Sequence, residues 1–257
     1  MKQILIIIGI ITSGLAFGQE SKTTDFLNEI QKYDISDLWT LNKFQTEFEG
    51  DTSLTNRQEP LGFIGDNYQR FYIHFISAIQ NPNNRFEYFV YGKTRVKTNI
   101  CTFQGLITIK ESKTYIESDL PPLKQGFVTG VYEFFEDSDQ KGTGIFKGAF
   151  KSNFFIDIKG NIQYDALNFV ADGFKNNQFQ GFWTGYNSKD SKKCNWGDYR
   201  IPESGDLDIG AGEFSPSQKY ASNGWITYIL NHKMNQLDVV NDPKISEFEN
   251  EKWWIEK

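Results

Sequence analysis

Four carboxylates in one short stretch of the chain could carry acid–base chemistry. Asp198, Asp206, Asp208 and Glu213 lie in a glycine-rich segment that also contains Arg200, and glycoside hydrolysis needs two carboxyl groups at a defined separation. These four are the candidate catalytic residues of a secreted glycan hydrolase. A chain with 33 acidic residues contains many such groupings, however, and carboxylates that are solvated or paired with arginine are more common. These carboxylates alone therefore do not indicate catalysis, and we favour a protein that is not an enzyme.

Metal and cofactor chemistry has little support in the residues present. Asp206, Asp208 and Glu213 could offer oxygen ligands to Ca²⁺, but Gly210 stands where an EF-hand loop would place another ligand. The chain has only two histidines, too few for a three-histidine zinc site. Nucleophile-elbow and phosphate-loop patterns are also missing. We expect neither a metal nor a cofactor.

One strand-like run offers a face that could bind a ligand. Residues alternate in this run so that Arg70, Tyr72 and His74 share the side opposite the apolar residues. These three are the first candidates for ligand binding, followed by Trp196 and Arg200. The chain contains 23 Phe, 12 Tyr and 6 Trp, which could line a cavity for sugars or apolar molecules. The alternative is that the aromatic residues only fill the core.

The elements that must position these residues are mainly β-strands. The stretch from Asp25 to Tyr33 has helical spacing and predicts one short N-terminal helix. After it come short runs rich in β-branched and aromatic residues, separated by Gly, Asn, Asp and Pro. The expected strands are Trp39–Phe48, Tyr68–Ile79, Phe86–Tyr91, Ile100–Lys110, Phe127–Phe135, Ile145–Phe150, Phe154–Ile158, Ile162–Leu167 and Phe179–Tyr186.

Glycines inside these runs decide between two antiparallel architectures. Gly148 and Gly181 interrupt strand-like segments, where glycine permits the bends that let a sheet curl and close. We therefore expect an antiparallel up-and-down β-barrel, with a β-sandwich as the alternative. The segment from Lys193 to Phe214 reads as a long loop, and the tail from Trp225 as a last strand or short helix that returns to the core.

The N-terminus has the pattern of a secretory signal peptide. Lys2 precedes an apolar stretch, and small residues stand at Ala16 and Gly18 before Gln19. We expect residues 1–18 to be removed, leaving residues 19–257 as a single β-rich domain that is secreted or periplasmic. The apolar stretch is shorter than the roughly 20 residues of a membrane-spanning helix, so an integral membrane protein is not expected. Because no cysteine stands at the processing site, we do not expect a lipoprotein.

Charge and cysteine content narrow the partners further. The formal net charge is −6, and the lysines are scattered among acids, so nucleic acid is not an expected partner. The two cysteines, Cys101 and Cys194, would meet an oxidising environment after export. We therefore expect them to form a disulfide, and two reduced thiols are the alternative.

Four segments resemble those of a family of uncharacterised secreted bacterial proteins. They are Leu61–Asp66 running into Tyr68–Phe75, Tyr91–Cys101, Asn176–Phe179 and Cys194–Phe214. The resemblance implies export and β architecture and carries no catalytic residues. A looser similarity, to lipocalin-like and avidin-like barrels, rests on glycine–aromatic strands such as Gly181-Phe182-Trp183 and concerns the fold only.

These observations together predict an exported, barrel-like protein of binding or envelope-associated accessory function. Its partner would be a small molecule or a glycan. A secreted glycan hydrolase that uses the loop carboxylates is the first alternative. A structural or protein-interaction module is the second.

Overall fold

The computed structural model describes residues 22–48, 51–188, 190–237 and 242–255, and the predicted signal peptide over residues 1–18 lies outside them. The described chain is mainly β-structured, with antiparallel sheets. Its strands are β1 (Thr23–Asp25), β2 (Lys43–Phe48), β3 (Asp51–Asn56), β4 (Leu61–Ile64), β5 (Gln69–Gln80), β6 (Glu87–Val96), β7 (Asn99–Tyr115), β8 (Lys124–Glu136), β9 (Gly144–Ile156), β10 (Ile162–Tyr164), β11 (Asn176–Gly185) and β12 (Ser191–Asp198). Its helices are α1 (Leu27–Ile30), α2 (Asp37–Thr40), α3 (Ile226–Leu237) and α4 (Pro243–Glu249), with short 3-10 helices η1 (Gly205–Leu207) and η2 (Gln218–Asn223).

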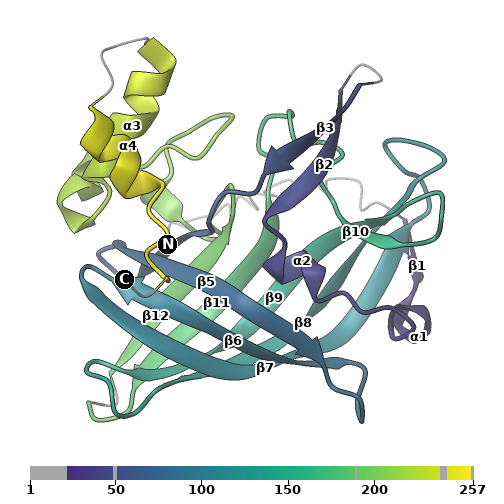
Figure 1. The fold of residues 1–257 in the computed structure, drawn as a ribbon, viewed down its shortest axis with the longest axis horizontal. Helices are drawn as coiled ribbons and strands as arrows, with labels where there is room; N and C mark the ends of the chain where they lie inside the picture. The colour runs from purple at the N-terminus through teal and green to yellow at the C-terminus, as the bar shows by residue number, and fades with distance from the viewer. Residues whose placement is uncertain (1–21, 49–50, 189, 238–241, 256–257) are drawn as a thin grey trace, which may run out of the picture.

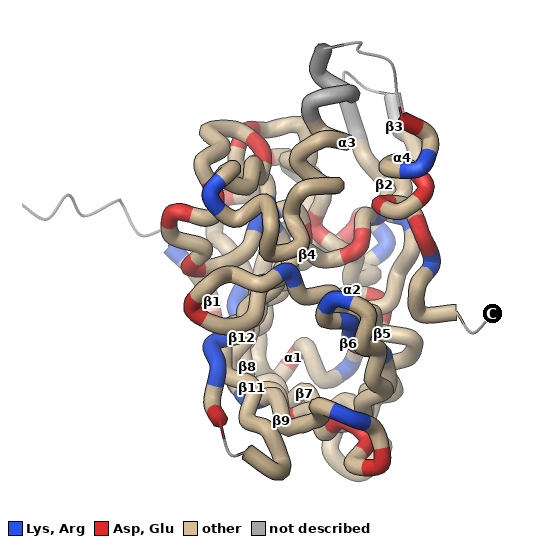
Figure 2. The backbone as a smooth tube through the Cα atoms, turned by 90° about the vertical axis from the view of Figure 1, so that its left-hand side faces the viewer, with Lys and Arg blue, Asp and Glu red and all other residues tan. Residues whose placement is uncertain are grey.

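Eight of the described strands pair in a closed ring (Figure 1). Following the ring, β4 pairs with β5, then come β6, β7, β8, β9, β11 and β12, and β12 pairs back with β4. Every pairing is antiparallel. Figure 2 shows the backbone turned by 90°, so that the strands of the ring surround its interior. Each of these strands therefore has a neighbour on both sides.

Side chains alternate between the inside and the outside of the ring. In β8, Val128, Tyr132, Phe134 and Glu136 are buried, while Val131 and Phe135 between them are exposed. This is the two-residue period of a strand with one face on a core. The inward residues of all eight strands form a core that is rich in aromatic rings.

Two of the interior glycines let β9 and β11 approach each other closely. Gly148 and Gly181 stand opposite each other in the register of this pair. A Cβ atom at Gly148 would lie 2.0 Å from the backbone oxygen of Gln180, which no side chain tolerates. Glycine is required at this position by the close backbone contact, which is one of the reasons for glycine inside strands.

The N-terminal segment closes one end of the ring. Trp39 of α2 is 2% exposed, and its ring contacts Tyr88 of β6 and Phe150 of β9. Its Nε1 donates a hydrogen bond of 3.0 Å to the hydroxyl of Ser152. Because these partners are inward residues of β6 and β9, α2 packs on the ring's own core. The interior is filled at this end.

The C-terminal part of the chain packs on the outside of the ring. A second hydrophobic cluster joins the outward side chains of β4 to η2 and α3, and it contains Leu61, Phe63, Ile201, Leu207, Phe214, Tyr220, Trp225 and Ile229. Both faces of β4 are therefore covered. No helix among the described residues is long and apolar enough to span a membrane.

The strand predictions hold for six of the eight ring strands; β4 was not predicted, and the predictions are wrong at three further places. The segment Trp39–Phe48 begins in helix α2, because Trp39 fills the end of the core. The two runs from Ile145 to Ile158 form one strand, β9, and the predicted loop starting at Lys193 begins with the second half of β12. The tail forms two helices, α3 and α4, which is one of the two forms expected for it. The predicted short N-terminal helix is present as α1.

The predicted disulfide is wrong, and the ring explains why. Cys101 and Cys194 are both free and buried, and they lie on β7 and β12, with three strands between them in either direction around the ring. Neighbouring strands lie about 4.8 Å apart, so an eight-strand ring is roughly 12 Å or more across. A disulfide needs Cα atoms about 4.4–6.8 Å apart, which opposite walls of the ring do not provide.

Candidate functional site

The end of the ring opposite α2 holds a cavity of about 630 Å³. The cavity and α2 lie at opposite ends of strand β6. Tyr88 near the start of this strand contacts Trp39 of α2, whereas Thr94 and Val96 near its end line the cavity. A volume of this size is typical of sites for small organic ligands. Its wall residues are Ile64, Phe71, Thr94, Val96, Cys101, Glu136, Phe146 and Trp183, and its mouth residues include Asp66, Asn67, Gln69, Lys97, Asn99, Ser191 and Lys192.

Glu136 places a carboxyl group in the cavity wall. It is 6% exposed and ends β8, whose alternation places it on the inward face. Its Oε1 accepts a 2.5 Å hydrogen bond from the hydroxyl of Thr94. Its Oε2 accepts from Trp183 Nε1 at 2.9 Å and from the backbone N–H of Gly144 at 3.0 Å. Three donors from three different strands thus fix the carboxyl group.

Burial of Glu136 disfavours its charged form. Desolvation raises the pKa of this carboxyl group above its ordinary value, while the hydrogen bonds from Thr94, Trp183 and Gly144 oppose that rise. A perturbed carboxyl group in an apolar pocket is a general indication of a functional site.

The two cysteines near this carboxyl group are not suited to nucleophilic chemistry. Burial and then the charge of Glu136 raise the pKa of the Cys101 thiol to about 11, and burial raises that of Cys194 well above its ordinary value. The thiolate is the reactive form of cysteine. Both residues therefore remain thiols at neutral pH and act as small side chains of the wall and core.

Aromatic rings form the apolar part of the site. Phe71 and Phe146 line the cavity, and their ring centroids lie 5.5 Å apart. Trp196 lies behind them, 1% exposed, with its ring stacked on that of Phe179 at 5.0 Å. Trp196 was predicted as a ligand-binding residue, and the structure places it in the core next to the cavity wall.

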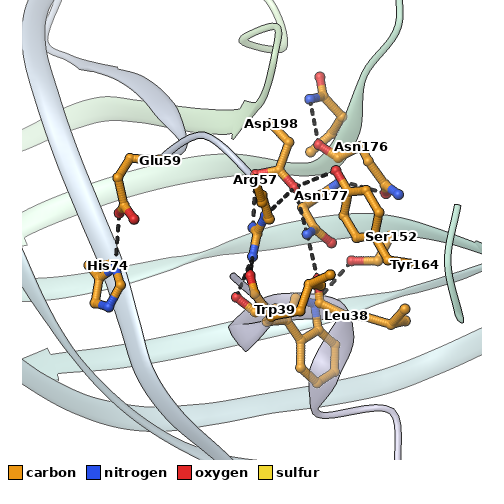
Figure 3. A network of polar contacts seen from close by, with 12 residues as sticks. Leu38, Trp39, Arg57, Glu59, His74, Ser152, Tyr164, Asn176, Asn177 and Asp198 are labelled. Atoms are coloured by element: carbon orange, nitrogen blue, oxygen red, sulfur yellow. Dashed lines mark hydrogen bonds and ion pairs between the residues drawn. The ribbon is translucent and has the colours of Figure 1, made fainter. Parts of the chain in front are cut away.

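A buried ion pair fastens the opposite, closed end of the ring (Figure 3). Arg57 donates to both carboxylate oxygens of Asp198, at 2.8 Å and 3.1 Å, and its Nη1 donates to the backbone oxygen of Trp39 at 2.8 Å. Asp198 also accepts from Tyr164 at 2.9 Å and from Asn177 at 2.8 Å. The pair thus ties the end of β12 to helix α2.

The electrostatics of this pair fit a structural role. Burial raises the pKa of Asp198, and Arg57 opposes that rise through its charge and its hydrogen bonds. One cavity lined by Arg57 has a volume of about 20 Å³, room for little more than one water molecule, and Asp198 itself is 1% exposed. Asp198, a predicted catalytic candidate, is therefore buried and already accepts hydrogen bonds from Arg57, Tyr164 and Asn177.

The predicted ligand-binding face of β5 lies on the outside of the ring. Arg70 forms an ion pair of 2.6 Å with Glu249 of α4, and Tyr72 contacts the ring of Trp253. His74 stacks on Trp254 at 3.8 Å between centroids, and its Nδ1 lies 2.9 Å from Glu59 (Figure 3). The three residues share one face, as the alternation predicts. The chain's own C-terminal segment occupies that face.

Arg200 organises the long loop that follows β12. Its Nη1 pairs with Asp208 at 2.7 Å, and its Nη2 donates to the backbone oxygens of Gly210, Ala211 and Gly212 at 3.2, 3.0 and 2.6 Å. Asp208 in turn accepts from the backbone N–H groups of residues 210 and 215. These bonds connect Arg200 and Asp208 to the loop backbone from Gly210 to Ser215.

The remaining carboxylates of this segment do not gather into one site. Asp206 pairs with Lys219 at 2.7 Å on an exposed surface, whereas Glu213 is 80% exposed and lies 3.8 Å from His232. Each of the four predicted catalytic carboxylates thus faces a different basic side chain, those of Arg57, Lys219, Arg200 and His232. Within the described residues no group of three or more His, Cys, Asp or Glu is placed to hold a metal ion.

Sequence reasoning missed Glu136 and Trp183, although a signal for one of them was present. The apolar run before Glu136 alternates as Tyr132, Glu133, Phe134, Phe135, and a period of two places residue 136 with Tyr132 and Phe134 on the core face. A carboxylate that continues a core face is a candidate buried acid. The role of Trp183 as its donor depends on the pairing of distant strands and leaves no local pattern.

No family model matches this chain, and neither a curated protein nor a solved structure matches it.

Proposed function

We propose that this protein binds a small organic molecule in the cavity lined by Glu136, Trp183, Phe71 and Phe146. The observation that carries the proposal is a cavity of about 630 Å³ with an apolar, aromatic wall and one buried carboxyl group fixed by three hydrogen bonds. Binding sites generally combine an apolar lining with a few well-placed polar groups.

The proposal includes the shape of the binding domain. A closed ring of eight strands supports an up-and-down β-barrel rather than a β-sandwich, because a sandwich leaves strand edges that such a ring does not have. A barrel of eight strands has an interior just wide enough for side chains or for one small ligand. Here α2 fills one end, and the cavity takes up the other.

A cavity-filling variant tests binding directly. We would replace Val96, which lines the cavity, by tryptophan, and use Phe89→Trp on the outer face of the same strand as the control. Binding of the neutral fluorescent probe N-phenylnaphthylamine should be lost in Val96→Trp and retained in Phe89→Trp. If the unmodified protein does not bind the probe, or if Val96→Trp binds it equally well, the cavity is not a binding site.

Native mass spectrometry of the protein isolated from its own cells would show whether the cavity carries a natural ligand. A mass above that of the chain, released on denaturation, would identify a carried ligand. The same isolation tests export, which the N-terminal charge and apolar stretch support. We propose a secreted or periplasmic location, and the isolated chain should then begin at Gln19.

A further inference from the structure

Glu136 is a buried carboxylate without a positive partner in the described chain, unlike three other buried carboxylates. Within the described part of the chain, no Lys, Arg or His side chain forms an ion pair with it. Three other carboxylates with side chains at most 7% exposed each face an arginine. These pairs are Asp198 with Arg57, Asp208 with Arg200 and Glu249 with Arg70.

Burying an ionised carboxylate without a counter-charge lowers the stability of the folded state, because the charge loses its hydration and gains no ionic partner. The three hydrogen bonds to Glu136 offset part of this cost, but none of them brings a full positive charge. Because Glu136 lines an open cavity, a bound molecule can supply the missing charge. The uncompensated carboxylate is therefore a feature of the ligand site and not of the fold.

The geometry leaves one position on this carboxylate for a ligand. An ionised carboxylate has about four acceptor positions. Two N–H groups occupy Oε2, those of Trp183 and Gly144, and the hydroxyl of Thr94 occupies one position on Oε1. The fourth position, on Oε1, has no protein donor in the described chain.

The surrounding rings suit a cation as well as an apolar body. Trp183 lines the same cavity as Glu136 and is hydrogen-bonded to it, and Phe71 and Phe146 line the wall. Aromatic faces attract ammonium groups, tryptophan most strongly. The structure already contains such a contact, because Lys192 Nζ lies 5.5 Å from the Trp183 ring centroid at the mouth. Sulfate-like or carboxylate ligands would instead meet the negative charge of Glu136.

We propose that the ligand is a protonated amine with an apolar or aromatic body, whose ammonium group donates to Oε1 of Glu136 beside the ring of Trp183. This inference rests on the proposed function of the cavity and names the class of molecule that it selects. The body of the ligand lies against Phe71 and Phe146, and the ammonium supplies the charge that the protein does not.

The test compares amines with neutral molecules of the same shape. Isothermal titration calorimetry would measure tryptamine against tryptophol, and octylamine against octanol, on the unmodified protein. Each amine should bind more tightly than its alcohol by about tenfold to a hundredfold, the range expected for a hydrogen bond to a charged group. N-acetyltryptamine, which keeps the body and loses the charge, should bind as weakly as tryptophol.

Two variants identify the carboxylate responsible. Glu136→Gln keeps the side-chain shape and can keep its three hydrogen-bond partners, and it should remove the preference for amines while leaving alcohol binding intact. Glu133→Gln removes the same charge from the outer face of the same strand, where Glu133 pairs with Lys147, and should leave the preference unchanged.

The outcomes separate this inference from the proposed function. If N-phenylnaphthylamine binds in the cavity but neither amine is preferred over its alcohol, the cavity is a binding site and the amine assignment is overturned. The same conclusion follows if Glu136→Gln and Glu133→Gln affect the preference equally. If the probe also fails to bind, the proposed function itself fails. The comparison of ligands on the unmodified protein decides the matter even if Glu136→Gln does not fold.

Discussion

The ion pair between Arg57 and Asp198 should be among the most important polar interactions for stability. Their side chains are 7% and 0% exposed, and two hydrogen bonds of 2.8 Å and 3.1 Å join them. Asp198→Asn keeps the shape of the side chain but leaves the guanidinium of Arg57 buried without its counter-charge. It also turns one of the two carboxylate oxygens, which accept hydrogen bonds from Arg57, Tyr164 and Asn177, into an NH₂ donor.

Breaking a buried pair by removing one partner costs about 3–5 kcal/mol. For a domain of this size each kcal/mol corresponds to roughly 2–4 °C in Tm, so Asp198→Asn should lower Tm by about 6–20 °C. Urea unfolding followed by tryptophan fluorescence would give the free energy of unfolding. Glu29→Gln, which breaks the exposed pair with Lys32 (51% and 62% exposed), is the control and should cost at most about 1 kcal/mol.

A double-mutant cycle tests whether the loss comes from the pair itself. Arg57→Met should also be strongly destabilising, because it leaves the Asp198 carboxylate buried, but Arg57→Met combined with Asp198→Asn should cost clearly less than the sum of the two. Additive losses, or single losses no larger than that of Glu29→Gln, would refute the assignment of this pair as the fastening of α2 to the ring.

Three further predictions concern the cavity and the cysteines. Burial raises the pKa of Glu136, so its contribution to stability is complete below the ordinary pKa of a glutamate and is lost as pH rises through the raised pKa of the folded state. Relative to Glu136→Gln, the ligand-free protein should therefore lose stability as pH rises from about 4, the ordinary glutamate pKa. Equal pH dependence of the two proteins in unfolding titrations would contradict this. Lys192→Met removes a cation 5.5 Å from the Trp183 ring and should strengthen tryptamine binding severalfold by calorimetry without changing tryptophol binding; a weaker amine affinity would argue against a shared aromatic site. Cys101 and Cys194 are free and buried, so a thiol reagent should label both only after unfolding, without prior reduction, and a requirement for reductant would show a disulfide.

Six of the eight strands of the ring could be predicted because their signals are local, whereas the short strands β4 and β12 were missed. Alternation in β5 and β8, and turn residues between the strands, follow from the steric properties of neighbouring residues. The partners of each strand depend on closure of the whole ring, which no local pattern contains. The disulfide prediction failed for this reason, since only the order of the strands shows that Cys101 and Cys194 lie on opposite walls.

The candidate site was harder to predict because charge in a sequence does not reveal burial. The segment containing Asp206, Asp208 and Glu213 attracted interest through its composition, yet its polar groups mainly satisfy each other or face solvent. Glu136 stands at the end of an apolar run and looks unremarkable in composition. Its importance comes from three donors on other strands and from the absence of a cation beside it in the described chain.

Each end of the ring contains a buried carboxylate, Asp198 at the closed end and Glu136 in the cavity. Only Asp198 has a counter-charge within the described chain, and we therefore expect Asp198 to affect stability and Glu136 to affect ligand binding. Asp198 receives its counter-charge from Arg57 within the chain, so its ionised form is part of the folded state. Glu136 receives hydrogen bonds but no counter-charge, so its ionised form is fully compensated only when a cation is bound. Asp198→Asn should therefore lower stability while the remaining folded protein keeps its affinity for amines, and Glu136→Gln should abolish the amine preference with little loss of stability. A variant at either end that changed both properties equally would mean that the cavity and the closed end are coupled through the core.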